Sequence, residues 1–193
     1  GKYYRVKQAK QRPFPVQRPH PAIMSAGSSK AGQNFAAKYA DVAFTSFYNH
    51  KPDDMRARGE VFRKLARDEY GRDIRVWTSA YIFQGETEAE ARRIYNYCVH
   101  EKGDQVAVGN LLTTMGLYSQ GLPVESLNFL KEHFIAGWGG YPLVGTKEQI
   151  VDGLKLLSDL GYDGILLSWA PYISGMAEFQ AKTLPLLVQT GLR

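Results

Sequence analysis

The sequence predicts an α/β fold with a parallel sheet. Short apolar runs alternate with longer amphipathic stretches along most of the chain, which is the pattern of strands followed by helices. Ser, Thr or Pro stands at the start of several amphipathic stretches and Gly at their ends, as expected of helix termini. Because strands that alternate with helices pair in parallel through right-handed crossovers, we expect one sheet with helices packed against it.

Four strands can be placed from these signals, together with the helices between them. The expected strands are residues 22–25, 40–47, 74–83 and 163–169. The expected helices begin at Ser29, Pro52, Thr87, Thr146 and about Gly175, and end near residues 39, 71, 98, 161 and 189. Two helix starts, Thr87 with Glu90 and Thr146 with Gln149, have the spacing of a capping box. In the last helix we expect the apolar side chains to face inward, namely Met176, Phe179, Leu184 and Leu187.

Residues 103–142 interrupt this alternation. They are rich in Gly, aromatic and Met residues, and only residues 124–134 have the pattern of an amphipathic helix. Residues 135–143 contain too many glycines for a helix. Long irregular excursions in compact domains often form lids or interfaces, so we predict one of these roles here.

The composition is that of a globular domain, with 44% hydrophobic and 22% charged residues in a chain of 193. Cys98 is the single cysteine, which excludes an internal disulfide and any multi-cysteine metal site, and its place on an apolar helical face predicts a core position. No stretch approaches the roughly 18 consecutive apolar residues of a membrane span. The start lacks the apolar segment of a signal peptide. We therefore expect a cytoplasmic protein that does not contact membranes.

Residues 1–20 predict an extended, basic lead-in to the domain. Residues 1–40 contain eight Lys or Arg and no Asp or Glu, whereas the remainder has 16 basic and 19 acidic residues. The lead-in is interrupted by prolines and has no recognised nucleic-acid motif, so we expect no nucleic-acid partner. A positive surface near an anion site, or packing on an acidic neighbour, explains the charge equally well. Residues 1–6 alternate weakly, as in the last strand of a hairpin, and the chain starts without Met, which suggests a fragment.

The turn after the first expected strand has the composition of a phosphate site. Gly27 can adopt backbone angles that other residues avoid, and Ser28 and Ser29 stand where the next helix needs a cap. The free N–H groups and the positive dipole end of a helix, with two hydroxyls beside them and the charge of Lys30, favour a bound phosphate. From the residues alone, a turn that only caps the helix is equally compatible with this pattern.

Four segments in order carry a family resemblance: AGSSKAG at 26–32, FAAKYAD at 35–41, LVGTKEQI at 143–150 and GYDGILLS at 161–168. Together they resemble the bacterial luciferase-like flavin monooxygenases, and most closely the branch that contains pyrimidine, nitrilotriacetate and dimethylsulfone monooxygenases. The resemblance implies a TIM (β/α)8 barrel, of which this chain would form strands five to eight with their helices.

Site residues and partners also follow from the resemblance. It assigns the serine matching Ser29 to the FMN phosphate, with the backbone of Gly27 and Ser28 completing the cradle. It implies that a separate NAD(P)H:flavin reductase supplies FMNH2, and that with O2 a small organosulfur or nitrogen compound is oxygenated. The catalytic residues stay unknown, because the family places most of them in the amino-terminal half. We therefore expect no activity from this chain alone.

Two alternatives to a half-enzyme stay open. The chain could be a non-catalytic flavin- or phosphate-binding protein whose half-barrel closes by pairing with a second copy. It could also be a nicked or partial form of a larger parent, whose function it shares only when the missing half is present.

A few remaining side chains have competing interpretations. Active groups should lie at the carboxyl ends of the strands, which include Phe47, Tyr48, Phe83, Gln84 and Trp169. For Trp138 and Trp169 we favour core or lid packing over a position in the wall of a substrate mouth. His50 and His133 lack a spaced set of metal ligands, so we interpret both as surface or loop histidines and expect no metal.

Overall fold

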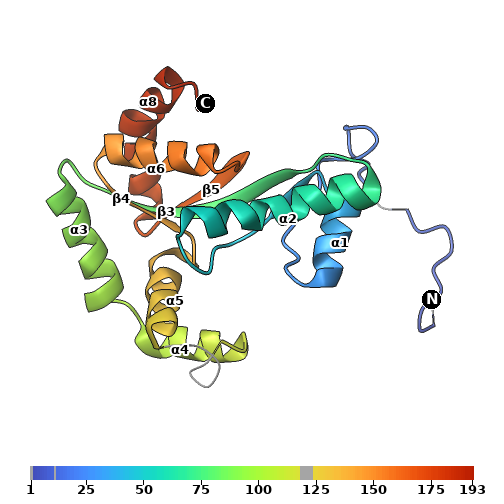
Figure 1. Cartoon of the computed structure of the whole chain (residues 1–193), viewed down its shortest axis with the longest axis horizontal. Coiled ribbons are helices and arrows are strands. Elements are labelled where there is room, and N and C mark those ends of the chain that lie inside the picture. The colour runs from blue at the N-terminus through green and yellow to red at the C-terminus, as the bar shows by residue number, and fades with distance from the viewer. Residues whose placement is uncertain (1, 11, 118–123) are drawn as a thin grey trace.

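The computed structural model describes residues 2–10, 12–117 and 124–193, and its centre is a parallel β-sheet (Figure 1). Every recorded strand pair is parallel. This confirms the predicted α/β class. The described strands are β1 (Met24–Ser25), β2 (Val42–Phe44), β3 (Arg75–Gln84), β4 (Tyr141–Gly145) and β5 (Gly164–Trp169).

The long strand β3 organises the sheet. It pairs with β2 near its start, from Arg75 to Trp77, and with β5 from Trp77 onward. Near its end it also pairs with β4, from Ala80 to Gln84. A strand has only two hydrogen-bonding edges, so β2 and β4 follow one another along one edge while β5 occupies the other. The strand β1 continues the sheet beyond β2.

The strand β4 is absent from the sequence-based prediction, which has four strands and assigns its first residues to the 103–142 excursion. The preceding helix α5 (Val124–Gly137) also runs three residues beyond its predicted end. The glycines that argue against regular structure are needed because this segment packs closely against β3. A Cβ on Gly140 would lie 3.3 Å from the backbone of Ala80, and one on Gly137 would collide with the Tyr81 side chain. Residues 118–123 of the excursion lie outside the described residues.

The predicted helices begin within about three residues of their expected starts, whereas α4 lies in the excursion and was not predicted. Besides α5 the described helices are α1 (Lys30–Tyr39), α2 (Pro52–Tyr70), α3 (Glu88–Asn96), α4 (Gln105–Thr114), α6 (Lys147–Asp159), α7 (Tyr172–Glu178) and α8 (Leu184–Gln189). Figure 1 shows α1 beside α2, and α4 with α5 extending away from the sheet. The reciprocal capping box is present at Thr146 and Gln149. At α3, Thr87 caps the helix but Glu90 bonds to the N–H of Glu86 instead.

The last predicted helix is divided in the structure. A π-helical turn, Phe179–Thr183, separates α7 from α8, and Pro185 is the second residue of α8. Proline has no N–H to continue the regular helical hydrogen bonds, which accounts for the break. The inward prediction is wrong for Met176, which is 43% exposed, whereas Phe179 and Leu187 are buried.

The main core lies between the sheet and helices α1, α2 and α6. It includes Ala36, Phe62, Val76, Leu143 and Leu157. Small residues on α1 let that helix approach the sheet closely, because Ala36 and Ala37 are fully buried. A second cluster lies under α3, and a third joins α4 to α5. Cys98 is partly buried and packs against the second cluster. This burial raises the pKa of its thiol.

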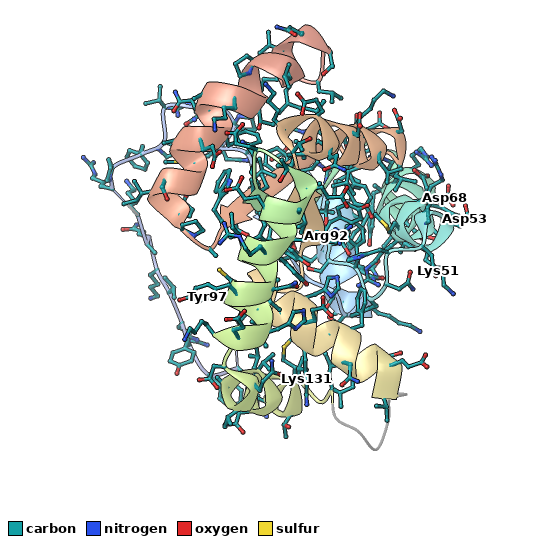
Figure 2. All side chains as sticks on the ribbon, turned by 90° about the vertical axis from the view of Figure 1, so that its left-hand side faces the viewer. Lys51, Asp53, Asp68, Arg92, Tyr97 and Lys131 are labelled. Carbon is teal, nitrogen blue, oxygen red and sulfur yellow. The ribbon has the colours of Figure 1, made fainter. Side chains whose placement is uncertain are left out.

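The outer helix faces and the lead-in are polar. Figure 2 shows Asp53 and Asp68 of α2 and Arg92 of α3 on the outside of the molecule. Residues 2–10 and 12–20 are exposed and contain no helix or strand, so the expected strand at residues 1–6 is wrong for the part that is described. Residues 1 and 11 lie outside the described residues. Among the described residues, the helices fall short of the length and apolar character that a membrane span requires.

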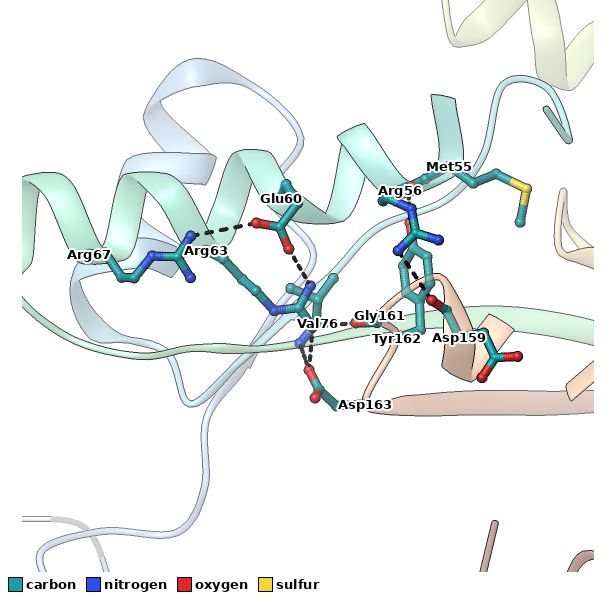
Figure 3. A network of polar contacts seen from close by, with 10 residues as sticks. All are labelled: Met55, Arg56, Glu60, Arg63, Arg67, Val76, Asp159, Gly161, Tyr162 and Asp163. Carbon is teal, nitrogen blue, oxygen red and sulfur yellow. Dashed lines mark hydrogen bonds and ion pairs between the residues drawn. The ribbon is translucent and has the colours of Figure 1, made fainter. Parts of the chain in front are cut away.

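A polar network closes the amino ends of β3 and β5 (Figure 3). The carboxylate of Asp163 accepts hydrogen bonds from the N–H of Val76 at 2.7 Å and from the guanidinium of Arg63 at 2.8 Å. Arg63 also donates to the carbonyl of Gly161 and pairs with Glu60. Tyr162 donates to the carbonyl of Met55 at 2.8 Å. These contacts fix α2 to the loop before β5, so this end of the sheet has a structural role.

Candidate functional site

The turn between β1 and α1 lies at the carboxyl end of the sheet. Ser29 is the N-cap of α1, and its Oγ accepts a hydrogen bond from the N–H of Gly32 at 3.1 Å. Its carbonyl accepts from the N–H of Gln33 at 2.8 Å. Because the first N–H groups of a helix lack partners within it, those of Lys30 and Ala31 stay available to an acceptor from outside. The positive end of the helix dipole points the same way.

Two glycines give this turn its shape. A Cβ on Gly27 would lie 2.7 Å from the Cα of Gly32, and a Cβ on Gly32 would lie equally close to Gly27. Gly27 has no positive φ, so the reason expected from sequence, an unusual backbone angle, is wrong. Glycine is needed here because the strand end and the first helical turn are in direct contact.

Two connected grooves open beside the turn. The large groove has a volume of about 600 Å³ and the small groove about 250 Å³. The two grooves share Ser28 of the turn, three residues that follow β2 and one residue of α2; the shared set is Ser28, Thr45, Phe47, Tyr48 and Arg58. The carboxyl ends of β1 and β2 therefore meet at one polar corner.

Arg58 supplies the positive charge of this corner. Its Nε donates to Thr45 Oγ1 at 3.0 Å, and its guanidinium lies over the ring of Tyr48 at 4.2 Å from the centroid. Among the described residues that line the large groove, it is the one charged side chain. Asp54 lines the small groove, where its carboxylate accepts from the side-chain amide of Asn49 at 3.0 Å.

The far wall of the large groove is apolar and comes from the excursion. Met115, Phe134 and Trp138 belong to it. Trp138 is 70% exposed and has a φ of 57°, in the left-handed region that a non-glycine residue seldom adopts. Of the predicted core or lid packing, the core position is therefore wrong for Trp138, which lies in the groove wall with its ring 5.7 Å from that of Phe134. Trp169 instead packs on Phe179 and Tyr172, as core packing predicts.

Two histidines join the excursion to the loop after β2. The rings of His50 and His133 lie 4.7 Å apart, and His50 also packs on Tyr141 and Phe129. Burial, and then the neighbouring His133, lower the pKa of His50 to about 4. Burial also lowers the pKa of His133, whose Nδ1 lies 2.8 Å from the carbonyl of Phe129. His133 is only 8% exposed, so a surface position is wrong for it. No group of three or more potential metal ligands occurs among the described residues.

Comparison with known proteins identifies the family. The sequence profile of the luciferase-like monooxygenases matches residues 1–164. The chain belongs to the luciferase-like monooxygenase family. It is 27% identical over 192 residues to an FMNH2-dependent dimethylsulfone monooxygenase of Pseudomonas putida, covering 97% of this chain and 52% of that protein. The chain thus spans about half the length of this luciferase-like relative.

Solved structures show the same relationship in three dimensions. DmoA from Hyphomicrobium sulfonivorans has a TM-score of 0.75 at 23% identity, over 99% of this chain and 46% of that one. The EDTA monooxygenase EmoA from Chelativorans sp. BNC1 has a TM-score of 0.72 at 21% identity, over 99% and 49%. The luciferase-like fold is therefore present as half of a TIM barrel, as predicted.

Within this luciferase-like half-barrel, the predicted site residues separate into two groups. Ser28, Phe47 and Tyr48 reach the grooves, with Ser29 at the adjoining helix start. The other carboxyl-end residues do not line them: Phe83 is buried in the second cluster, and Gln84 accepts a hydrogen bond from Thr183. Sequence reasoning missed Arg58, because one arginine on a heavily charged helix gives no signal until the helix is placed against Thr45.

Proposed function

We propose that this chain is the FMN-phosphate-binding half of a two-component, reduced-FMN-dependent monooxygenase that oxygenates a small organosulfur or nitrogen-containing compound. Membership of the luciferase-like family is the observation that carries the proposal. The substrate class follows two relatives, a dimethylsulfone monooxygenase and an EDTA monooxygenase. The groove adds support, because a polar corner and an apolar wall suit a ligand with one anionic end and one aromatic or apolar part.

The turn fits the phosphate of FMN. Gly27, Ser28 and Ser29 would hold it, because close packing of Gly27 on Gly32 brings backbone N–H groups to the surface at a positive helix end. Ser29 Oγ accepts from Gly32 and can still donate its own hydrogen to a phosphate oxygen. The helix cap and the phosphate site are therefore compatible. Bound reduced FMN supplies the electrons with which O2 is activated.

The proposed activity requires two protein partners. A separate NAD(P)H:flavin reductase would supply FMNH2, and the proposed location of the protein is the cytoplasm. An amino-terminal half-barrel completes the fold and brings the catalytic residues, so the chain alone is expected to be inactive. The exposed groove would then become the interior of the closed barrel, from which water is excluded.

A reconstitution experiment tests this function. The chain is co-expressed with an amino-terminal half-barrel of the family, and loss of dimethylsulfone or EDTA is followed with NADH, FMN and a flavin reductase. We expect substrate loss that requires both halves, the reductase and O2. If both halves fold and associate but neither compound nor a panel of related sulfones and amines is consumed, the proposal is wrong.

A non-catalytic flavin-binding protein is the rival function. The open groove at the carboxyl ends of the strands favours it, because a second copy of the chain could cover this groove and close the barrel. The two functions predict different masses and spectra. A homodimer that keeps a yellow flavin through gel filtration would support the rival, whereas a chain that pairs only with an amino-terminal half would support the monooxygenase.

A further inference from the structure

Arg58 borders the same space as the serine turn. Arg58 of α2 and Ser28 each line both the large and the small groove. The two residues are far apart in sequence and belong to successive β-α units, so the folding of the sheet brings them together. A ligand whose anionic end rests on Ser28 therefore lies in a groove that Arg58 also lines.

Two contacts hold the Arg58 guanidinium in place, and neither uses its terminal nitrogens. Its Nε bonds to Oγ1 of Thr45, which is buried, and its plane rests on the ring of Tyr48. Within the described residues, the two terminal nitrogens have no recorded hydrogen bond or ion pair. A planar guanidinium with two free parallel N–H groups is suited to bidentate contact with a phosphate.

Other arginines of the chain are paired differently. Arg63 and Arg67 each reach the carboxylate of Glu60, and Arg92 pairs with Glu88. Asp54 is one helical turn before Arg58 and could pair with it. Its carboxylate instead bonds to Asn49, and no ion pair with Arg58 is formed. The charge of Arg58 is therefore not neutralised within the described part of the protein.

We infer that Arg58 is a second anchor for the phosphate of FMN, beside the turn formed by Gly27, Ser28 and Ser29. The inference rests on the proposed flavin function and adds a residue to it. The turn offers a helix dipole and N–H groups, which carry only partial charge, whereas the FMN phosphate has a charge near −2 at neutral pH. The full charge of Arg58 would complete the neutralisation.

Binding of FMN and riboflavin separates a phosphate contact from other effects. Riboflavin has the same ring and lacks the phosphate. Dissociation constants for both flavins are measured by fluorescence quenching with the wild-type chain, with Arg58→Gln and with Arg67→Gln. Arg67 is the control because it lies on the same helix and pairs with Glu60 on the outer face. We expect Arg58→Gln to weaken FMN binding about 10- to 100-fold and to leave riboflavin binding unchanged. Arg67→Gln should change neither.

Each other outcome overturns a different claim. A wild-type chain that binds FMN no better than riboflavin overturns the proposed phosphate cradle, and the role of Arg58 with it. A wild-type preference for FMN that Arg58→Gln retains overturns the role of Arg58 alone. Equal weakening of both flavins by Arg58→Gln, or a lower melting temperature with an unchanged FMN preference, would show that Arg58 only supports the fold through Thr45.

Discussion

Two arginines in the middle of helix α2 reach opposite ends of the sheet and are used in opposite ways. Arg63 is 16% exposed, and its guanidinium contacts Asp163, Glu60 and the carbonyl of Gly161 at the amino ends of the strands. Arg58, five residues earlier, reaches the carboxyl end of β2 and uses only Nε for a hydrogen bond. One guanidinium is enclosed by acceptors from its own chain. The other faces a groove with its terminal N–H groups available.

The difference follows the general division of labour in α/β barrels. The amino ends of the strands are closed by short loops whose polar groups satisfy one another, which stabilises the fold. The carboxyl ends are followed by the residues that bind ligands, and polar groups there are left for the ligand. In this chain, saturation of hydrogen bonds therefore distinguishes structural from binding positions better than residue type does. Mutations at the two ends should accordingly affect different measurements.

Loss of Asp163 should give the largest change in stability. Asp163→Ala removes the acceptor for both Arg63 and the N–H of Val76, so we expect the free energy of unfolding to fall by about 2 to 3 kcal/mol. FMN affinity should not change. Denaturant unfolding and flavin titration measure the two quantities. Asp159→Ala is the control, because its exposed pair with Lys155 should contribute less than about 1 kcal/mol. Equal effects of the two substitutions would contradict a structural role for this network.

Loss of the Ser29 hydroxyl, at the carboxyl end of the sheet, should weaken FMN binding. Ser29→Ala removes one hydrogen-bond donor from the proposed phosphate site, and we expect FMN binding to weaken by about 1 to 3 kcal/mol. It also removes the cap of α1, at about 1 kcal/mol of stability. Thr146→Ala is matched to it, because Thr146 caps α6 in the same way but lies outside the turn between β1 and α1. The two variants should lose similar stability, and only Ser29→Ala should lose FMN affinity.

Mild acid should lower the stability of the folded protein through His50. The pKa of His50 is about 4 in the folded protein, below its ordinary value of 6.5, because its ring is partly buried beside His133. Between these values the unfolded chain binds the proton and the folded chain does not, so stability falls as pH decreases from about 6.5 toward 4. After allowance for partial exposure we expect a loss of about 1 kcal/mol.

His50→Phe isolates this effect. Phe keeps an aromatic ring against Phe47, Phe129 and Tyr141 but cannot be protonated. The variant should show a smaller loss of stability than the wild type between pH 6.5 and 5. Thermal melts at a series of pH values measure this difference. Parallel pH profiles for the two proteins would show that His50 is not responsible.

The sequence was sufficient for the elements whose signals are local. Apolar periodicity and caps located β3, β5 and helices α1, α2 and α6, and the Gly and Ser residues marked the turn before α1. The strand β4 was missed because the glycines before it, Gly137 and Gly140, allow close approach to β3, which only the tertiary structure reveals. The groove role of Arg58 and the burial of His133 could not be predicted for the same reason. Both depend on contacts with residues distant in sequence, Thr45 for Arg58 and His50 for His133.

The position of the phosphate in a crystal structure of the FMN complex tests the central claim most directly. The account predicts that the phosphate lies within hydrogen-bonding distance of the N–H groups at the start of α1 and of Ser29 Oγ, at the corner that Ser28 and Arg58 share. A phosphate bound elsewhere on the chain, with the turn contacting only protein or solvent, would contradict it.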